Sequence, residues 1–172
     1  MVSELVMPAR IFLVGFMGAG KTTIGRLLAD RLGWSFVDLD AEVERREGRS
    51  VADIFASVGE SCFRSMETES LRAVSGPGRS VIALGGGTYI DAANRSLVDS
   101  LGTSVYLDAP FDALFGRIED DGSRPLAGSR SEMELLFAER VASYKMARMR
   151  VDVASRAPED IVNEVLRGLE DS

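Results

Sequence analysis

The chain of 172 residues contains no histidine, a single cysteine and only two lysines. Without histidine it cannot carry a Ser-His-Asp triad, a histidine-ligated metal or a histidine general base. The lone cysteine, Cys62, cannot form an internal disulfide or a cysteine-ligated zinc site, so we expect it to be a small, part-buried apolar residue. Histidine-based chemistry and a zinc site of this kind are therefore excluded.

Positive charge is also scarce, because 27 acidic residues outweigh 20 Lys and Arg residues and leave a formal net charge of −7. This balance argues against a nucleic-acid or membrane-surface partner, since both require a basic face. The stretch MVSELVMPARIFLVG has no basic leading region and only a short apolar run, so neither a signal peptide nor a membrane span is predicted. We expect a cytoplasmic protein with one domain over residues 1–172.

Short apolar runs alternate with segments of helical periodicity along the chain. The predicted strands are residues 10–14, 34–38, 80–84, 103–110 and 150–155. The predicted helices are residues 21–33, 39–48, 50–59, 60–74, 91–102, 111–118, 131–147 and 158–170, with Asp91 and Ser131 as N-caps. This order predicts an α/β fold with a five-stranded parallel sheet flanked by helices, in which ligands bind beyond the carboxyl ends of the strands.

A glycine-rich loop follows the first predicted strand. Its sequence, GFMGAGKT, fits the pattern G-x-x-x-x-G-K-S/T between a strand and a helix. Glycines let successive N–H groups turn inward around a phosphate, and the following helix aims its N-terminal dipole at the same point. Lys21 adds a full positive charge, and the hydroxyl of Thr22 can ligate Mg²⁺. The stretch therefore predicts a P-loop that binds a nucleotide phosphate.

Other features narrow the class of P-loop protein. A GTPase would show N-K-x-D, but Asn94 and Asn163 are followed by Arg and Glu. The third predicted strand ends in three glycines without an acid, whereas the second ends with Asp38 and Asp40. Residues two apart in an extended chain point the same way, so both carboxylates could face the crevice. The alternative is that Asp40 serves only as the N-cap of the helix that follows.

These motifs resemble the shikimate kinase family over essentially the whole chain. The segments that carry the resemblance occur in the family's order: GFMGAGKTTIGRLLA, FVDLDAEVERREGRSVADIFASVGE, FRSME, LGGGT and RPLAG. Acids after the second strand, an F-R pair, a triple glycine and an R-P-L segment are not shared together by adenylate kinases or GTPases. The resemblance implies the P-loop NTPase fold, ATP and shikimate as substrates, Mg²⁺ as cofactor, and a monomer.

On the nucleotide side, the resemblance implies a set of ATP-binding residues and a mobile lid over residues 119–130. The ATP-binding residues are Gly18, Ala19, Gly20, Lys21, Thr22, Thr23, Arg117, Arg124 and Arg156. Within this set, Lys21 and the lid residue Arg124 reach the transferred phosphoryl group. Thr22 and Asp38 hold Mg²⁺. The lid sequence contains glycine and proline, as expected of a loop that closes over ATP and excludes water.

On the acceptor side, the resemblance implies that shikimate binds to Asp40, Arg64, Gly86 and Arg140, within and beyond a helical segment over residues 40–75. Asp40 is also the candidate acceptor of the hydroxyl proton. Two planar arginine forks suit a carboxylate, and a glycine leaves room for a ligand near the backbone. The family's R-x-P-x-Y pattern has lost its proline, since Ala142 stands there, and the segment after Tyr144 is one residue shorter than expected, which bears on the place of Arg156.

Two other functions remain open at this point. A related small-molecule kinase, such as a gluconate kinase, would share the P-loop but would not need both Arg64 and the glycine triplet. A non-catalytic nucleotide-binding module would need neither a lid arginine nor an acceptor-side acid.

Overall fold

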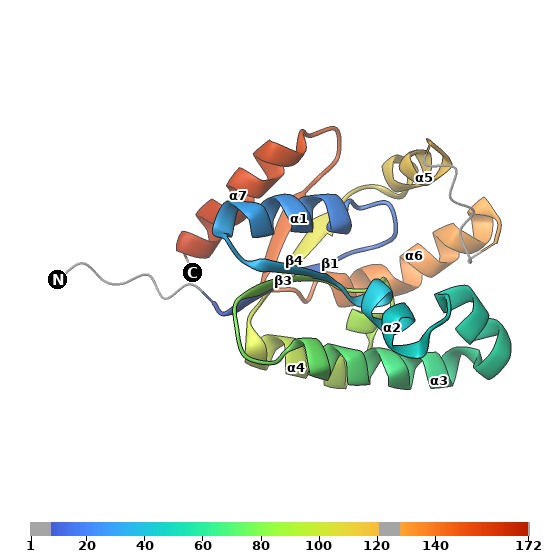
Figure 1. Ribbon diagram of the computed structural model, residues 1–172. Coiled ribbons are helices and arrows are strands. Elements are labelled where there is room, and N and C mark those ends of the chain that lie inside the picture. The colour runs from blue at the N-terminus through green and yellow to red at the C-terminus, as the bar shows by residue number, and fades with distance from the viewer. Residues whose placement is uncertain (1–7, 121–127, 172) are drawn as a thin grey trace.

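The computed structural model describes residues 8–120 and 128–171 of the chain (Figure 1). One parallel sheet runs through the molecule in the order β2-β3-β1-β4-β5. Its strands are β1 (Arg10–Val14), β2 (Ser35–Asp38), β3 (Ser80–Ala83), β4 (Thr103–Asp108) and β5 (Met149–Asp152). The predicted five-stranded parallel sheet is therefore confirmed.

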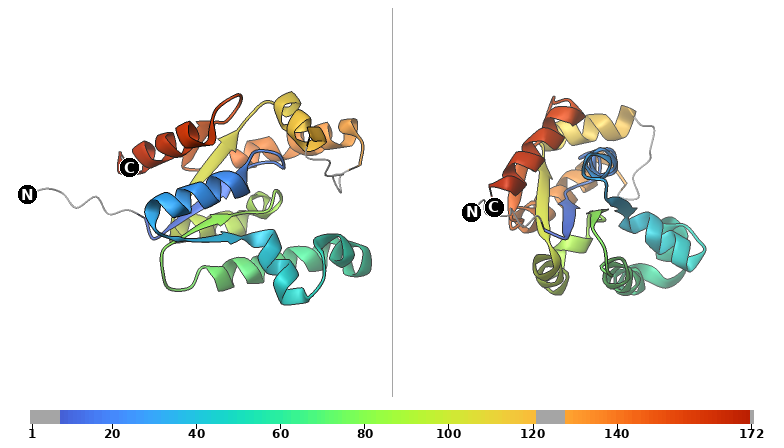
Figure 2. Two further views of the ribbon diagram at one scale, coloured as in Figure 1. Left: turned by 45° about the horizontal axis from the view of Figure 1, so that its top comes forward. Right: turned by 60° about the vertical axis from the view of Figure 1, so that its left-hand side comes forward.

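Helices cover both faces of this sheet (Figure 2). They are α1 (Lys21–Leu32), α2 (Leu39–Glu47), α3 (Val51–Val74), the short 3₁₀ helix η1 (Thr88–Ile90), α4 (Ala92–Leu101), α5 (Phe111–Asp120), α6 (Arg130–Tyr144) and α7 (Pro158–Glu170). Helices α1 and α7 lie on one face, and α3 and α4 lie on the other. None of the helices within the described ranges is long and apolar enough to cross a membrane.

The three central strands form the core, as their unbroken apolar sequences predict for strands covered on both faces. In β1, Ile11, Phe12 and Leu13 are fully buried, and every residue of β3 is buried. Burial of this apolar surface is the main favourable contribution to folding. It also fixes the sheet as a rigid base for the loops that leave its carboxyl edge.

Several predicted helix ends are confirmed by their capping geometry. Helices α1 and α2 stop at Gly33 and Gly48, which adopt the left-handed conformation with φ of 66° and 67°. The side chain of Asp91 caps α4 by accepting a hydrogen bond from the backbone N–H of Asn94. The two helices predicted for residues 50–74 are the halves of α3, which is broken at Gly59, where φ is 80° and ψ is 174°.

Three predictions about local structure are wrong. The N-cap of α6 is Ser129 rather than Ser131, because Ser129 and Glu132 exchange side-chain and backbone hydrogen bonds in a capping box. This helix also ends at Tyr144 instead of residue 147, since Met146 and Ala147 turn back with tighter hydrogen bonds to the carbonyls three residues earlier. Cys62 is exposed, not part-buried.

Candidate active site

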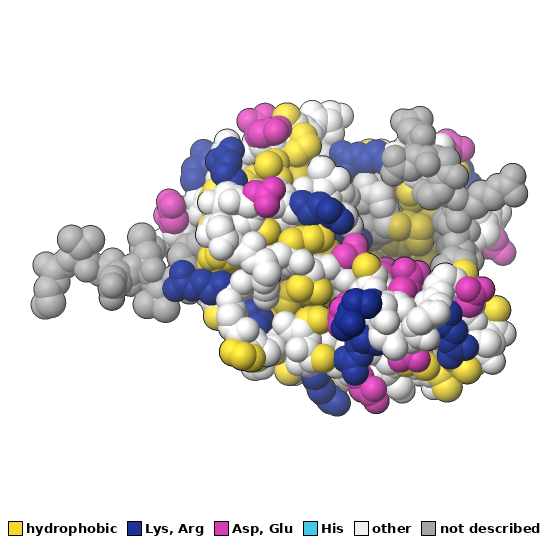
Figure 3. All heavy atoms as spheres, in the orientation of Figure 1, with side chains coloured by type: hydrophobic (Ala, Val, Ile, Leu, Met, Phe, Trp, Pro, Cys, Tyr) yellow, Lys and Arg dark blue, Asp and Glu magenta, His cyan; other side chains and the backbone are white. Residues whose placement is uncertain are grey.

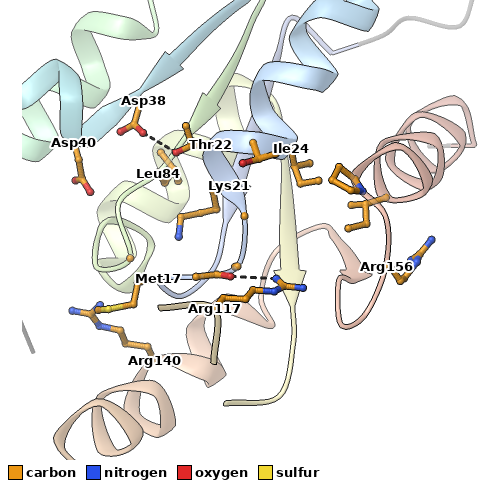
Figure 4. Close-up of a pocket in the computed structure, with 18 residues that line it drawn as sticks. Met17, Lys21, Thr22, Ile24, Asp38, Asp40, Leu84, Arg117, Arg140 and Arg156 are labelled. Atoms are coloured by element: carbon orange, nitrogen blue, oxygen red, sulfur yellow. Dashed lines mark hydrogen bonds between the residues drawn. The ribbon is translucent and has the colours of Figure 1, made fainter. Parts of the chain in front are cut away.

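A cavity of about 700 Å³ opens at the carboxyl edge of the sheet, where the fold rule places ligands (Figure 4). The residues that line it include Gly18, Ala19, Gly20, Lys21, Thr22, Thr23, Asp38, Asp40, Gly86, Arg117, Arg140 and Arg156. The sequence predicts a site role for each of these. Arg64 is not among the described residues that line the cavity, but its guanidinium group lies against Gly87 of the glycine triplet. The prediction for Arg124 lies outside the described residues.

The P-loop joins β1 to α1 and adopts a conformation that depends on glycine. Gly18 and Gly20 have φ of 78° and 89°, a region that side chains disfavour. A Cβ on Gly18 would also lie 2.8 Å from the carbonyl oxygen of Leu114 in α5. The loop therefore packs against α5 while the N–H groups that begin α1 stay directed at the cavity, the arrangement that binds phosphate.

Lys21 lies at the start of α1 with its ammonium group folded toward the P-loop. Its Nζ donates hydrogen bonds to the carbonyl oxygens of Gly15 at 2.7 Å and Phe16 at 2.9 Å. Burial lowers the pKa of Lys21 to about 8, against the opposing charges of Asp40 and Asp38. The charge is thus held at the floor of the cavity by the backbone of the loop that binds the phosphates.

Asp38 links the P-loop helix to the second strand. Its Oδ2 accepts a hydrogen bond from the Thr22 hydroxyl at 3.0 Å, and its Oδ1 accepts one from the backbone N–H of Ala41 at 3.2 Å. Asp38 is therefore the N-cap of α2, and the alternative that gave this role to Asp40 is wrong. Thr22 and Asp38 offer only oxygen ligands on one wall of the cavity, the donor type that Mg²⁺ prefers.

No group of three or more His, Cys, Asp or Glu side chains within residues 8–120 and 128–171 is placed to enclose a metal. Mg²⁺ does not require such a group, because it is usually held by one or two protein oxygens together with waters and substrate phosphates. A hydroxyl and a carboxylate beside a phosphate loop meet that description.

Asp40 reaches the cavity from a helix and not from extended chain, so the expected alternation with Asp38 does not apply. It lies in the first turn of α2, and the helical turn brings its carboxylate to the same cavity. Burial, followed by the neighbouring carboxylates of Glu67 and Asp38, raises the pKa of Asp40 to about 6. Such a carboxylate is ionised near neutrality but remains a ready proton acceptor.

The glycine triplet after β3 lets three charged side chains approach the backbone. A Cβ on Gly85 would lie 2.7 Å from Asp40 Oδ1. A Cβ on Gly86 would lie 3.1 Å from Arg140 Nη1. A Cβ on the third glycine, at position 87, would lie 2.3 Å from Nη2 of Arg64. The triplet is thus the surface against which the acid and both arginines of the acceptor side are arranged.

Arg64 projects from α3 and is held by two acids of the same helix. Its Nη1 donates to Glu67 Oε2 at 2.9 Å, and its Nη2 donates to Glu60 Oε1 at 3.4 Å. Arg140 projects from α6, one turn before Tyr144, whose hydroxyl donates to the carbonyl oxygen of Gly86 at 2.5 Å. Burial raises the pKa of Tyr144 to about 12, so this hydroxyl keeps its proton.

At the other end of the cavity, two arginines are fixed by backbone carbonyls. Arg117 donates to Gly18 O at 3.2 Å and to Val153 O at 2.6 Å, so it connects the P-loop with the segment after β5. Arg156 donates to Asp152 O at 2.9 Å. Both side chains line the cavity, and Figure 4 shows Arg156 on the side opposite Asp40, with Arg117 between them.

Sequence reasoning missed three residues of the site: Glu67, Tyr144 and Pro158. Glu67 is 1% exposed and pairs with Arg64, and the segment FRSME that contains it carries part of the family resemblance. Tyr144 closes the R-x-P-x-Y pattern and holds Gly86. The sequence predicts Pro158 only as the first residue of a helix, but this proline also lines the cavity.

Known proteins share this architecture over almost the full chain. Shikimate kinase from Persephonella marina is 41% identical over 157 residues, which cover 91% of this chain and 96% of that relative. The structure of shikimate kinase from Acinetobacter baumannii in complex with shikimate superposes with a TM-score of 0.90 at 35% identity, covering 96% of this chain and 94% of that one.

More distant structures share the fold alone. A gluconokinase from Sinorhizobium meliloti superposes with a TM-score of 0.63 at 18% identity, covering 96% of this chain and 93% of that one.

The family model described as "Shikimate kinase" matches residues 17–170. These include the P-loop lysine, Asp38 at the end of β2, Asp40 in α2, the glycine triplet and the site arginines. The chain therefore belongs to the shikimate kinase family of ATP-dependent phosphotransferases.

Proposed function

We propose that the protein transfers the γ-phosphoryl group of ATP to the 3-hydroxyl of shikimate, giving ADP and 3-phosphoshikimate for aromatic amino-acid synthesis. One observation carries the proposal. A single cavity joins a P-loop with its lysine to a half-buried carboxylate, Asp40, and to the arginine Arg140. Phosphoryl transfer is catalysed by positioning and charge stabilisation, and this cavity supplies both on its two sides.

On the donor side, backbone N–H groups of residues 18–23 bind the phosphates of ATP. Lys21 exchanges its two carbonyl partners in the P-loop for phosphate oxygens and neutralises charge as the γ-phosphoryl group leaves. Arg117 and Arg156 enclose the adenine at the far end, beside Pro158. Their guanidinium planes are already fixed by backbone carbonyls, so little side-chain freedom is lost on binding.

Thr22 and Asp38 would hold Mg²⁺ between the protein and the phosphates. When bound, this ion supplies charge neutralisation at the β- and γ-phosphates. The Thr22 hydroxyl is oriented for this task, because its proton is donated to Asp38 and its lone pairs are left for a metal.

On the acceptor side, Asp40 orients the attacking hydroxyl and takes its proton at a carboxylate oxygen. Arg64 and Arg140 bind the carboxylate of shikimate through charge-assisted hydrogen bonds. The ring lies along the glycine triplet, where Gly86 leaves room for it. The helical segment over residues 40–75, which carries Asp40 and Arg64, acts as the shikimate-binding part of one domain.

The proposal includes a lid over residues 119–130 with Arg124 on the transferring phosphoryl group, which rests on the family pattern. We also propose that the protein is a monomer. A cytoplasmic location follows from the need for ATP.

A coupled assay of ADP release tests the proposal with shikimate, gluconate and nucleoside monophosphates as competing acceptors. We expect rapid ADP release when shikimate is the acceptor, and little release when gluconate or a nucleoside monophosphate is the acceptor. Faster turnover of gluconate would point to another small-molecule kinase. ATP binding without turnover of any acceptor would point to a non-catalytic module.

A further inference from the structure

A buried chain of hydrogen bonds ends at Arg64. Thr88, the first residue of η1, is fully buried, and its hydroxyl donates to Glu67 Oε1 at 2.6 Å. The other carboxylate oxygen of Glu67 accepts from Arg64 Nη1 at 2.9 Å. Thr88, Glu67 and Arg64 therefore form one continuous chain that ends at the guanidinium group.

Glu67 needs both of these donors. Its side chain is 1% exposed, and a buried carboxylate oxygen without a hydrogen-bond donor is costly. Oε1 also faces another acid, because a Cβ on Gly85 would lie 2.8 Å from Glu67 Oε1 and 2.7 Å from Asp40 Oδ1. The hydrogen bond from the Thr88 hydroxyl offsets part of the negative charge on this oxygen and so weakens its electrostatic repulsion with the Asp40 carboxylate.

Thr88 is itself held firmly. Its backbone N–H donates to Gly85 O at 3.1 Å, and its carbonyl accepts from Asn94 Nδ2 at 3.1 Å. Asn94 in turn accepts from the Thr68 hydroxyl at 3.1 Å. A β-branched side chain on such a fixed backbone has few rotamers, so the hydroxyl has a defined direction.

We propose that Thr88 is a positioning residue that acts through Glu67 on Arg64 and holds the arginine fork in the orientation that receives the acceptor's carboxylate. This inference rests on the proposed function. Apart from Glu67, Arg64 contacts Glu60, an acid whose side chain is 67% exposed, and the ring of the adjacent Phe63, and neither contact fixes the fork as a short hydrogen bond to a buried carboxylate does. If the Thr88 hydroxyl is removed, Glu67 Oε1 loses its hydrogen-bond donor, and the Glu67 side chain rotates away from Asp40. The guanidinium group of Arg64 is then no longer held in one orientation by Glu67.

The test compares Thr88→Val, which keeps the shape and removes the hydroxyl, with Thr88→Ser, which keeps the hydroxyl. Tyr89→Phe is the matched control, because this adjacent residue is 1% exposed and its hydroxyl donates to Ser104 in β4, away from the cavity. For each variant, kcat and the KM values for shikimate and ATP are measured. Thr88→Ala replaces the valine variant if that one does not fold.

We expect Thr88→Val to raise the KM for shikimate about tenfold, with the KM for ATP within about twofold of the parent. Thr88→Ser and Tyr89→Phe should stay near the parent. In an Arg64→Lys background, Thr88→Val should add little. A full tenfold effect in that background, or equal changes in both KM values, would overturn the inference.

The chain of contacts is tested separately from activity by the same double-mutant cycle read out as free energy of unfolding. Non-additive effects of Thr88→Val and Arg64→Lys support the chain, and additive effects contradict it. A parent protein inactive on shikimate would refute the proposed function, whereas additive unfolding effects would refute the role of Thr88.

Discussion

The two sides of the cavity are built in different ways. The phosphate-binding part of the donor side comes from one stretch, residues 15–23, and its shape is set by glycine backbone angles and by carbonyls that hold Lys21. The acceptor side combines side chains from α2, α3 and α6 around the glycine triplet. Arg64 pairs with Glu67 of its own helix, and the Tyr144 hydroxyl donates to the carbonyl oxygen of Gly86. Under the proposed function, a phosphate is bound by local backbone, whereas the acceptor is bound by side chains from distant segments.

The first prediction removes the charge of the donor side. Lys21→Ala should lower kcat by several orders of magnitude while the fold is retained, because charge neutralisation is central to phosphoryl transfer. Lys145→Ala is the control, since Lys145 is the only other lysine and is exposed. Steady-state kinetics and a thermal melt measure both effects. A folded Lys21→Ala protein with near-normal turnover would refute the P-loop assignment.

The second prediction removes the acid of the acceptor side. Asp40→Asn should lower kcat about 100- to 10,000-fold with ATP binding retained, because proton abstraction by a positioned base is worth that much. Stability should not fall, since the change also removes a repulsion with Glu67. Turnover at the parent level would show that Asp40 is not the base.

The third prediction displaces Arg64 without altering it. In Gly87→Ala, the new methyl group would overlap the guanidinium group, which must move. The backbone at Gly87 has φ of −99°, which alanine adopts, so the effect is steric. We expect the KM for shikimate to rise about tenfold, with little effect on ATP.

The matched control for Gly87→Ala is Gly116→Ala in α5. A Cβ at Gly116 would meet no atom within 4 Å. This variant should keep both KM values and gain about 0.5–1 kcal/mol in stability from the better helix former. Equal KM values for shikimate in the two variants would show that the absence of a side chain at Gly87 is not needed to position Arg64.

The fourth and smallest prediction concerns pH. Activity requires ionised Asp40 and charged Lys21, so kcat/KM should fall below about pH 6 and again above about pH 8. The pKa of Asp40 is raised in the folded state, so the native state binds more protons than the unfolded one between pH 3.8 and about 6. Stability should therefore decline as pH rises through that window.

Asp40→Asn tests whether Asp40 causes this decline. The variant has no carboxyl group to titrate at position 40, so its free energy of unfolding should not decline across the window. Chemical denaturation at several pH values measures this directly. A parent protein whose stability does not change in the window would contradict the raised pKa of Asp40.

The sequence was sufficient where structure is local. The strand–loop–helix around Lys21, the glycine stops at Gly33 and Gly48, and the cap at Asp91 all depend on residues within a few positions of one another. The N-cap predicted at Ser131 is wrong although the deciding signal is also local, because Glu132 lies three residues after Ser129, which is the spacing of a capping box.

The acceptor side could not be worked out locally. Thr88 meets Glu67 across 21 positions and Tyr144 meets Gly86 across 58, so no local pattern reveals either contact. Strand alternation predicts that Asp38 and Asp40 face the same way, but it does not apply here, because α2 begins at Leu39 and Asp40 is already helical. The acceptor residues are predicted by the family resemblance and not by the periodicity of apolar residues.

Asp38 has both carboxylate oxygens in use, one on Thr22 and one on the first turn of α2. A shift of this side chain toward a metal would loosen the cap of the helix that carries Asp40. Under the proposed function, Asp38 therefore connects the nucleotide site with the acceptor site. Any thermodynamic coupling through it must be reciprocal, so the factor by which nucleotide changes acceptor affinity equals the factor by which acceptor changes nucleotide affinity.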